Sequence, residues 1–143
     1  MTVPMHVLIA ACGQPGLLRR TLRSFAECEQ PAGFRGVLVI ENGPRSGLEA
    51  VVREFGSGRF CRYLYSEPAN KSLALNRGLD LVRAGLCLFT DDDVIASPQT
   101  LVAYARAAGC RHGGFLGGPI IPDYEAEAPP AWLRPYLPRS AAG

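Results

Sequence analysis

Short apolar runs alternate with longer amphipathic segments along most of this sequence, and this alternation restricts the possible folds more than any other property. Residues 6–11, 37–40 and 86–89 are apolar without a regular polar alternation, which is typical of strands buried on both faces. The segments between them space their apolar residues as one face of a helix does. Strands that alternate with helices of about ten residues predict right-handed βαβ units. We therefore expect an α/β fold with a mostly parallel sheet flanked by helices.

Turn residues set the expected element boundaries. Gly85 is predicted to cap the third helix at its C-terminus, and Ser97 with Pro98 predicts the N-cap and first residue of the fourth helix. The predicted elements are strand 6–11, helix 17–25, strand 37–40, helix 48–55, strand 63–65, helix 73–82, strand 86–89, helix 98 to about 109, and a short strand or extended segment over 115–120.

The chain is long enough for one domain. It has 143 residues, 48% of them hydrophobic, and a domain of this size buries about two thirds of its extended-chain surface. We expect residues 1–118 to form the α/β domain. From Pro119 onward prolines interrupt every periodic pattern, so residues 119–143 are predicted to be an extended tail. Trp132 and Tyr136 in this tail are apolar enough to pack on a surface outside the chain.

Charge and composition exclude several classes of function. The formal net charge of +2 is too balanced for a nucleic-acid-binding protein. No apolar run reaches the ~18 residues of a membrane-spanning helix, and residues 1–6 lack the pattern of a secretion signal. The expected location is therefore the cytoplasm, including the inner face of the membrane. The five cysteines contain no C-x-x-C pair, which argues against a zinc site or a disulfide framework.

Three consecutive carboxylates, Asp91, Asp92 and Asp93, follow the fourth predicted strand. Ligands bind at the carboxyl ends of the strands in open α/β sheets. Adjacent carboxylates repel one another, and Mg²⁺ or Mn²⁺ would relieve this repulsion while taking its other oxygen ligands from phosphate and water. In an extended segment Asp91 and Asp93 point the same way and Asp92 points opposite. A solvated acidic turn is the alternative.

Two other positions carry groups suited to a nucleotide. Glu41 ends the second predicted strand, where it could accept a hydrogen bond from a base or a ribose, or cap the turn at 42–43. Lys71, the only lysine, lies near the expected N-terminus of the third helix, where phosphate is favoured, and Arg77 is a second basic candidate. A plain capped helix with solvated basic residues is the alternative for this segment.

Several common catalytic motifs are missing from the sequence. No Gly-x-Gly-x-x-Gly follows the first strand, and neither a Gly-Lys-Ser/Thr loop nor a Gly-x-Ser-x-Gly elbow occurs. A phosphatase with Asp91 as nucleophile in a D-x-D-x-[TV] motif is disfavoured, because residue 95 is Ile and Lys71 lies upstream.

The strand and helix ends together resemble the N-terminal half of the family 2 glycosyltransferases, which have the GT-A fold. The resemblance covers about residues 5–133, and the order and spacing of the motifs make it specific. The matching segments are 7–18 (VLIAACGQPGLL), 20–25 (RTLRSF), 37–43 (VLVIENG), 71–78 (KSLALNRG), 89–94 (FTDDDV) and 115–120 (FLGGPI).

The resemblance implies a Rossmann-like site for a nucleotide-diphospho-sugar, with a UDP-sugar favoured and Mg²⁺ or Mn²⁺ as the cofactor. The implied reaction is inverting transfer of the sugar to an acceptor hydroxyl. Ala10 and Ala11 would lie beside the base, and Glu41 would bond it. The implied donor-binding residues are Ala10, Ala11, Glu41, Lys71, Asp91 and Asp92, and the implied metal ligands are Asp93 and Asp91.

Some positions depart from the family pattern. Ala10-Ala11-Cys12 stands where Pro-Thr-Tyr is usual, which removes an aromatic ring that would stack on the base. Glu41 replaces the commoner Asp, and Ser72 stands where Gly is common.

The family's catalytic base and acceptor site lie well beyond the D-x-D motif. The acids that follow Asp93 are Asp123, Glu125 and Glu127, in a proline-rich segment, and we assign none of them as the base. We expect a C-terminally truncated GT-A sheet whose Trp132 region faces a missing half or a partner chain. Sugar transfer by this chain alone is expected to be undetectable or very slow, and a non-catalytic nucleotide- or metal-binding module is the alternative function.

Overall fold

The computed structural model describes residues 3–56, 58–82, 84–110, 113–124 and 127–137. The chain divides into two compact units, residues 1–113 and 114–143. The division predicted from the sequence lies a few residues later, at 118–119, and stays a prediction. The first unit contains every strand of the described chain and the four α-helices.

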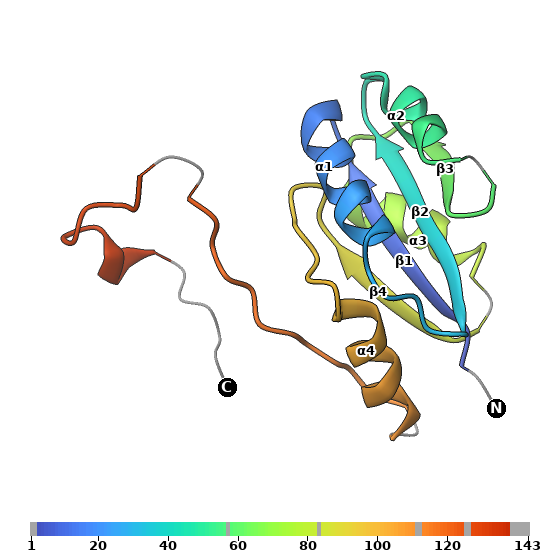
Figure 1. The fold of residues 1–143 in the computed structure, drawn as a ribbon. Helices are drawn as coiled ribbons and strands as arrows, with labels where there is room; N and C mark the ends of the chain where they lie inside the picture. Colours follow the sequence, from blue (N-terminus) through green and yellow to red (C-terminus); the bar gives the residue numbers. More distant parts are fainter. Residues whose placement is uncertain (1–2, 57, 83, 111–112, 125–126, 138–143) are drawn as a thin grey trace. The chain divides into compact units, whose positions relative to one another are not determined.

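The sheet of the first unit has four parallel strands in the order β3-β2-β1-β4 (Figure 1). This result confirms the expected α/β fold. Ile9 at the centre of β1 is in register with Val39 on one side and Thr90 on the other. The strands are β1 (Met5–Ala11), β2 (Phe34–Asn42), β3 (Cys61–Ser66) and β4 (Leu86–Thr90).

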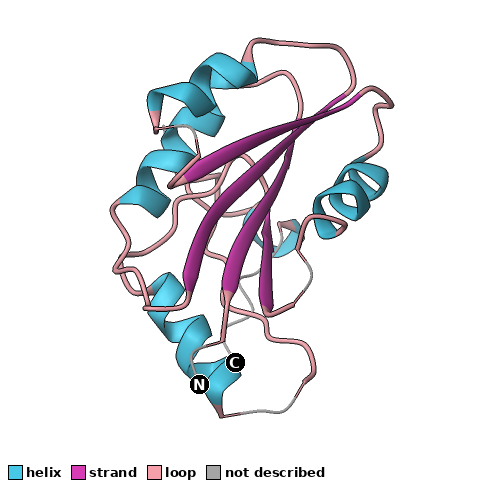
Figure 2. Cartoon of the chain, turned by 90° about the vertical axis from the view of Figure 1, so that its right-hand side faces the viewer, coloured by secondary structure: helices cyan, strands magenta, loops and turns pink. Residues whose placement is uncertain are grey.

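Helices cover both faces of this sheet (Figure 2). They are α1 (Pro15–Ala26), α2 (Leu48–Glu54), α3 (Lys71–Leu79) and α4 (Thr100–Gly109). Val7 and Ile9 of β1 belong to the larger hydrophobic core, with residues of α1, α2 and α4. Leu8 and Ala10 face the other way and pack with α3 in a smaller core. Because successive side chains of a strand alternate between faces, the continuous apolar run of β1 fills both cores.

Glycine allows α3 to lie very close to the sheet. A Cβ at Gly78 would come within 3.0 Å of Ile40 Cδ1 and 3.2 Å of Leu8 Cδ2, which is tighter than ordinary van der Waals contact. This close packing holds α3 against β1 and β2, so its first residue, Lys71, lies near the carboxyl ends of the strands.

Two predicted helix ends are wrong. α3 ends at Leu79 with Asp80 as its C-cap, so Gly85 does not cap it. Gly85 has instead a positive φ of 111°, and a Cβ there would lie 2.2 Å from the Pro4 carbonyl oxygen. The glycine is therefore required by the close approach of two backbone segments rather than by a helix end.

α4 begins at Thr100 with Gln99 as its N-cap, two residues later than the Ser-Pro signal predicts. The Thr100 N–H donates to the Ser97 carbonyl at 3.0 Å, so residues 97–100 form a turn that leads into the helix. The strand alternative for residues 115–120 is also wrong, because residues 114–124 contain neither helix nor strand. The described part of the second unit contains one short 3₁₀ helix, η1 (Arg134–Tyr136).

A buried carboxylate fixes the turn that follows β2. Glu41 is 1% exposed, and its Oε1 accepts hydrogen bonds from the Ser46 N–H (2.6 Å) and the Ser46 hydroxyl (2.8 Å). Its Oε2 accepts a hydrogen bond from the Tyr63 hydroxyl. Burial alone would raise the pKa of Glu41, but these donors and the charge of Arg45 hold it below its ordinary value.

Two buried serines provide a matched test of hydrogen bonding in the fold. Ser66 is fully buried at the end of β3, and its hydroxyl has no hydrogen-bond partner among the described residues. The Ser24 hydroxyl donates to the Thr21 carbonyl (2.7 Å) and accepts from the Ala96 N–H (3.0 Å). Since an unpaired buried hydroxyl is destabilising, Ser66→Ala should raise the free energy of unfolding by about 1 kcal/mol and Ser24→Ala should lower it by about 1 kcal/mol.

Urea denaturation of the two variants and the wild type measures both changes. Equal losses of stability in the two variants would contradict the assignment of Ser66 as unpaired.

Glu41 also predicts a pH dependence of stability. Its pKa is lower in the folded state than in the unfolded chain, where it is about 4.3. The ionised carboxylate therefore stabilises the fold above that value, and the contribution is lost as the pH falls through the lower folded pKa. In thermal melts between about pH 6 and pH 3, the wild type should lose more stability than Glu41→Gln. Parallel pH profiles of the two proteins would contradict this prediction.

Candidate functional site

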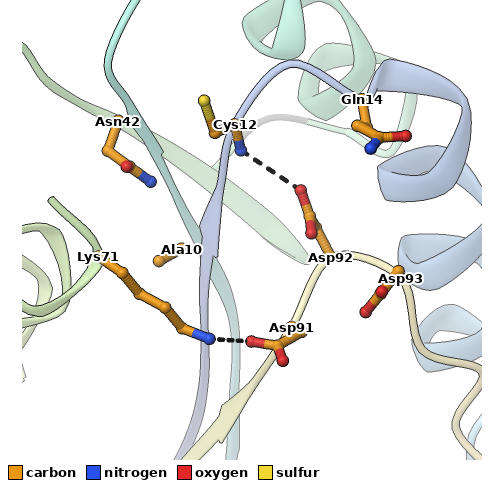
Figure 3. A pocket seen from close by; sticks show the side chains of 8 residues that line it. All are labelled: Ala10, Cys12, Gln14, Asn42, Lys71, Asp91, Asp92 and Asp93. Atoms are coloured by element: carbon orange, nitrogen blue, oxygen red, sulfur yellow. Dashed lines mark hydrogen bonds and ion pairs between the residues drawn. The ribbon is translucent and has the colours of Figure 1, made fainter. Parts of the chain in front are cut away.

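An open pocket of about 290 Å³ lies at the carboxyl ends of the strands. β2 and β3 lie on one side of β1 and β4 lies on the other, so the direction in which strands are added reverses between β1 and β4. Open α/β sheets bind ligands at such switch points. The residues that line the pocket are Ala10, Cys12, Gln14, Asn42, Lys71, Asp91, Asp92 and Asp93 (Figure 3).

All three consecutive aspartates line this one pocket. β4 ends at Thr90, and residues 92–93 form a turn. The predicted alternation of Asp91, Asp92 and Asp93 about an extended segment is therefore wrong, because the segment leaves the strand before the alternation begins. The turn brings three like charges to the same opening.

Asp92 is the anchored member of the three. Its carboxylate accepts a hydrogen bond from the Cys12 N–H at 3.4 Å (Figure 3). Its backbone carbonyl accepts one from the Thr21 hydroxyl at 2.8 Å. Burial raises the pKa of Asp92, and the negative charges of Asp93 and Asp91 act in the same direction, against the Cys12 hydrogen bond. Asp92 thus connects the loop after β4 to the loop after β1.

Lys71 pairs with Asp91 across the pocket (Figure 3). It is the first residue of α3, and Asn70 caps this helix by accepting a hydrogen bond from the Leu73 N–H at 2.9 Å. Both side chains of the pair remain 56% exposed, so water and ions reach them. The pocket therefore has two features that favour negative charge, the Lys71 ammonium beside Asp91 and the N-terminus of α3.

The donor set fits a hard divalent cation that shares its ligands with a phosphate. The exposed Asp93 carboxylate has no hydrogen-bond or ion-pair partner among the described residues. No group of three or more His, Cys, Asp or Glu able to hold a metal occurs in the described parts of the chain. One or two aspartates with phosphate and water oxygens match the way Mg²⁺ and Mn²⁺ are bound at phosphate sites.

The pocket contains most of the residues predicted from the sequence. Ala10, Lys71, Asp91, Asp92 and Asp93 line it. Two other predicted residues do not: Ala11 is buried and its carbonyl accepts from the Asn42 side chain at 3.1 Å, and Glu41 is buried below the surface. Their predicted contacts with a base stay predictions.

Three pocket residues were missed as site residues, namely Cys12, Gln14 and Asn42. Cys12 and Gln14 lie between β1 and α1, and Asn42 is the last residue of β2, so the rule that ligands bind at strand ends was the signal that could have identified them.

None of the carboxylates beyond Asp93 belongs to the described part of the first unit. Asp123 and Glu127 belong to the second unit, and Glu125 lies outside the described residues. Within the described ranges, no helix is long and apolar enough to cross a membrane.

The fold is similar to those of solved glycosyltransferase structures. S. aureus TarS matches with a TM-score of 0.64 and 18% sequence identity over 72% of this chain and 19% of that one. TarS 1–349 in complex with UDP matches with a TM-score of 0.62 and 18% identity over 72% of this chain and 31% of that one. The mannosyltransferase PcManGT from Pyrobaculum calidifontis, in complex with GDP-Man and Mn²⁺, matches with a TM-score of 0.63 and 19% identity over 76% and 32%.

These similarities establish a Rossmann-like GT-A fold. The chain spans about a third or less of the length of these solved structures. A search of curated protein sequences found no relative. The profile of one family, Glycosyl transferase family 2, matches residues 6–125. Since the match covers most of the sequence, the chain belongs to glycosyl transferase family 2.

Proposed function

We propose that the pocket binds a nucleotide-diphospho-sugar together with Mg²⁺ or Mn²⁺, for inverting transfer of the sugar to an acceptor hydroxyl. The observation that carries the proposal is the convergence of three carboxylates and the only lysine in one pocket at the switch point of the sheet. Membership of family 2 supports the same reaction class.

Different charged side chains of the pocket are proposed to hold the metal and the diphosphate of the donor. Asp93, with Asp91, is proposed to hold the metal, because Asp93 has no competing partner among the described residues. Lys71 would then bind the diphosphate, with Asp92 fixing the loop against β1. The bound metal would supply stabilisation of the negative charge that develops on the departing nucleoside diphosphate.

The base of the nucleotide is proposed to lie beside Ala10 and Ala11. No aromatic side chain lines the described pocket, so stacking contributes little to the recognition of the base. TarS has been solved with UDP and PcManGT with GDP-Man. We favour a UDP-sugar as the donor for this chain. We place the protein in the cytoplasm or at the inner face of the membrane.

A second candidate function follows from the residues after the three aspartates. Residues 94–113 of the first unit contain no carboxylate that could act as a general base. A nucleotide- and metal-binding module without catalysis therefore remains the alternative. Trp132 and Tyr136, which are 71% and 81% exposed, would contact the acceptor half or a partner chain.

A first prediction concerns binding of the nucleotide with its metal. About 1 mM UDP with Mn²⁺ should raise the melting temperature by several degrees, because a ligand selective for the folded state stabilises it by RT ln(1 + [L]/Kd). Differential scanning fluorimetry measures the effect, with samples that contain UDP and Mn²⁺, GDP and Mn²⁺, or each metal alone. A folded sample that shows no shift with either nucleotide and Mn²⁺ would refute donor binding.

Asp93→Asn should abolish the part of this shift that depends on Mn²⁺. Asp80→Asn is the matched control, because Asp80 is an exposed carboxylate at the C-terminal end of α3 and does not line the pocket. A metal-dependent shift that survives in Asp93→Asn would show that the metal binds elsewhere.

A second prediction separates the diphosphate from the base. Lys71→Gln should weaken UDP binding about tenfold to a hundredfold, since a charge-assisted hydrogen bond contributes about 1.5–3 kcal/mol. The same variant should bind uridine as the wild type does. Titration calorimetry with both ligands, and with Arg106→Gln on α4 as a control for lost positive charge, checks this. Equal losses for UDP and uridine would contradict a role on the diphosphate.

A further inference from the structure

A chain of hydrogen bonds connects the buried Glu41 to the loop that lines the pocket. The Gly13 N–H donates to the Ser46 hydroxyl at 3.2 Å, and this hydroxyl in turn donates to Glu41 Oε1 at 2.8 Å. Gly13 lies between Cys12 and Gln14, which both line the pocket. The chain therefore runs from the end of β2 to the loop after β1.

The direction of each hydrogen bond is determined by chemistry. A serine hydroxyl has one proton to donate and lone pairs to accept with, and an ionised carboxylate can only accept. Because the Ser46 hydroxyl uses its proton in the hydrogen bond to Glu41, it presents a lone pair to the Gly13 N–H. Glu41 thus orients the hydroxyl that holds Gly13.

Protein groups donate three hydrogen bonds to the Glu41 carboxylate. Oε1 takes both the N–H and the hydroxyl of Ser46, and Oε2 takes the Tyr63 hydroxyl. Arg45 Nη1 lies 3.4 Å from the Tyr63 oxygen on the outer side. Both oxygens therefore already have protein donors, and Glu41 is 1% exposed and does not line the pocket, so a nucleotide base could reach it only if the surrounding loop moved.

The loop between β2 and α2 is held from a second side. The Arg45 guanidinium stacks over the Tyr65 ring at 3.9 Å, and the Tyr65 hydroxyl donates to the Gly43 carbonyl at 2.9 Å. Ser46 is therefore presented by an anchored loop. The loop after β1 has a second contact, because the Cys12 N–H donates to the Asp92 carboxylate. Two successive amides of this loop, those of Cys12 and Gly13, are therefore held by hydrogen bonds.

We propose that Glu41 is a positioning residue, which acts through Ser46 to set the loop around Gly13 that lines the pocket, and that it does not contact the donor. The inference rests on the proposed function insofar as the pocket binds a nucleotide. It assigns to Glu41 a different role from the contact with the base that the family resemblance implies.

Two substitutions separate the two roles. Ser46→Ala leaves the carboxylate in place but removes the acceptor of the Gly13 N–H. Under the positioning role it should weaken UDP and GDP binding by similar factors, about threefold to tenfold, with Mn²⁺ present. If Glu41 instead contacted the base, Ser46→Ala would remove one of the two hydrogen bonds to Oε1, free a lone pair for the base, and leave the affinity unchanged or higher.

Glu41→Gln is the conservative variant, because its amide oxygen can still accept from Ser46 while its NH₂ faces Tyr63. Under the positioning role it should bind UDP within about threefold of the wild type and keep the wild-type preference between UDP and GDP. Glu41→Leu, which has no acceptor, should behave as Ser46→Ala does. Ser97→Ala is the serine control, because its hydroxyl is exposed and bonds Thr100 Oγ1 at 3.0 Å, away from the pocket lining.

Hydrogen exchange of the Gly13 amide, followed by NMR without nucleotide, tests the chain of hydrogen bonds independently of the proposed function. Ser46→Ala and Glu41→Leu should accelerate this exchange about tenfold, while Glu41→Gln and Ser97→Ala should not. Unchanged Gly13 exchange in Ser46→Ala would overturn the inference even if UDP binds. If the wild type binds neither nucleotide, the proposed function fails, and the exchange result alone decides whether the loop is held in this way.

In calorimetric titrations of a wild type that binds UDP, the expected result is loss of affinity in Ser46→Ala and its retention in Glu41→Gln. A Glu41→Gln variant that loses UDP affinity or changes its preference between UDP and GDP, beside a Ser46→Ala variant that binds normally, would overturn the positioning role.

Discussion

The burial of β1 on both of its faces and between two neighbouring strands fixes every group around the pocket. Val7, Leu8 and Ile9 have no exposed surface, and they pack alternately into the two cores. Their backbones pair with β2 on one side and β4 on the other. A strand held in this way cannot shift its register by one residue without turning apolar side chains from one core to the other. The loops at its carboxyl end therefore have a defined starting point.

The defined positions of these loops reduce the repulsion among the three aspartates that follow β4. Asp91, Asp92 and Asp93 leave the sheet where β4 ends, and each meets a different environment: Lys71, the Cys12 N–H, and solvent. The fold thus concentrates negative charge at an edge already supplied with a helix N-terminus and backbone donors. This combination suits a cation that brings anionic phosphate with it, because each of the two reduces the electrostatic cost of binding the other.

The sequence predicted the α/β class and the identity of the main strands, because apolar runs and turn residues are local properties. Five of the eight pocket residues were also named: the three aspartates from their position after a strand, Lys71 from its place near a helix N-terminus, and Ala10 from the family resemblance. The sequence did not predict that the Glu41 carboxylate would accept hydrogen bonds from Ser46 and Tyr63. That arrangement depends on β3 pairing with β2, so that Tyr63 lies one strand away from Glu41, and on a loop conformation that no local pattern encodes. The end of α3 was misjudged for a similar reason, since Gly85 is required by contact with Pro4 rather than by the helix.

We propose that a divalent metal and a nucleoside diphosphate bind together at the carboxyl ends of β1 and β4. Paramagnetic line broadening by Mn²⁺ in the NMR spectrum locates the metal directly. With UDP present, Mn²⁺ should selectively broaden the amide signals of Cys12, Lys71 and Asp93, and leave those of Arg106 on α4 sharp. Broadening that is centred elsewhere, or that is the same with and without UDP, would contradict joint binding of the metal and the diphosphate at this site.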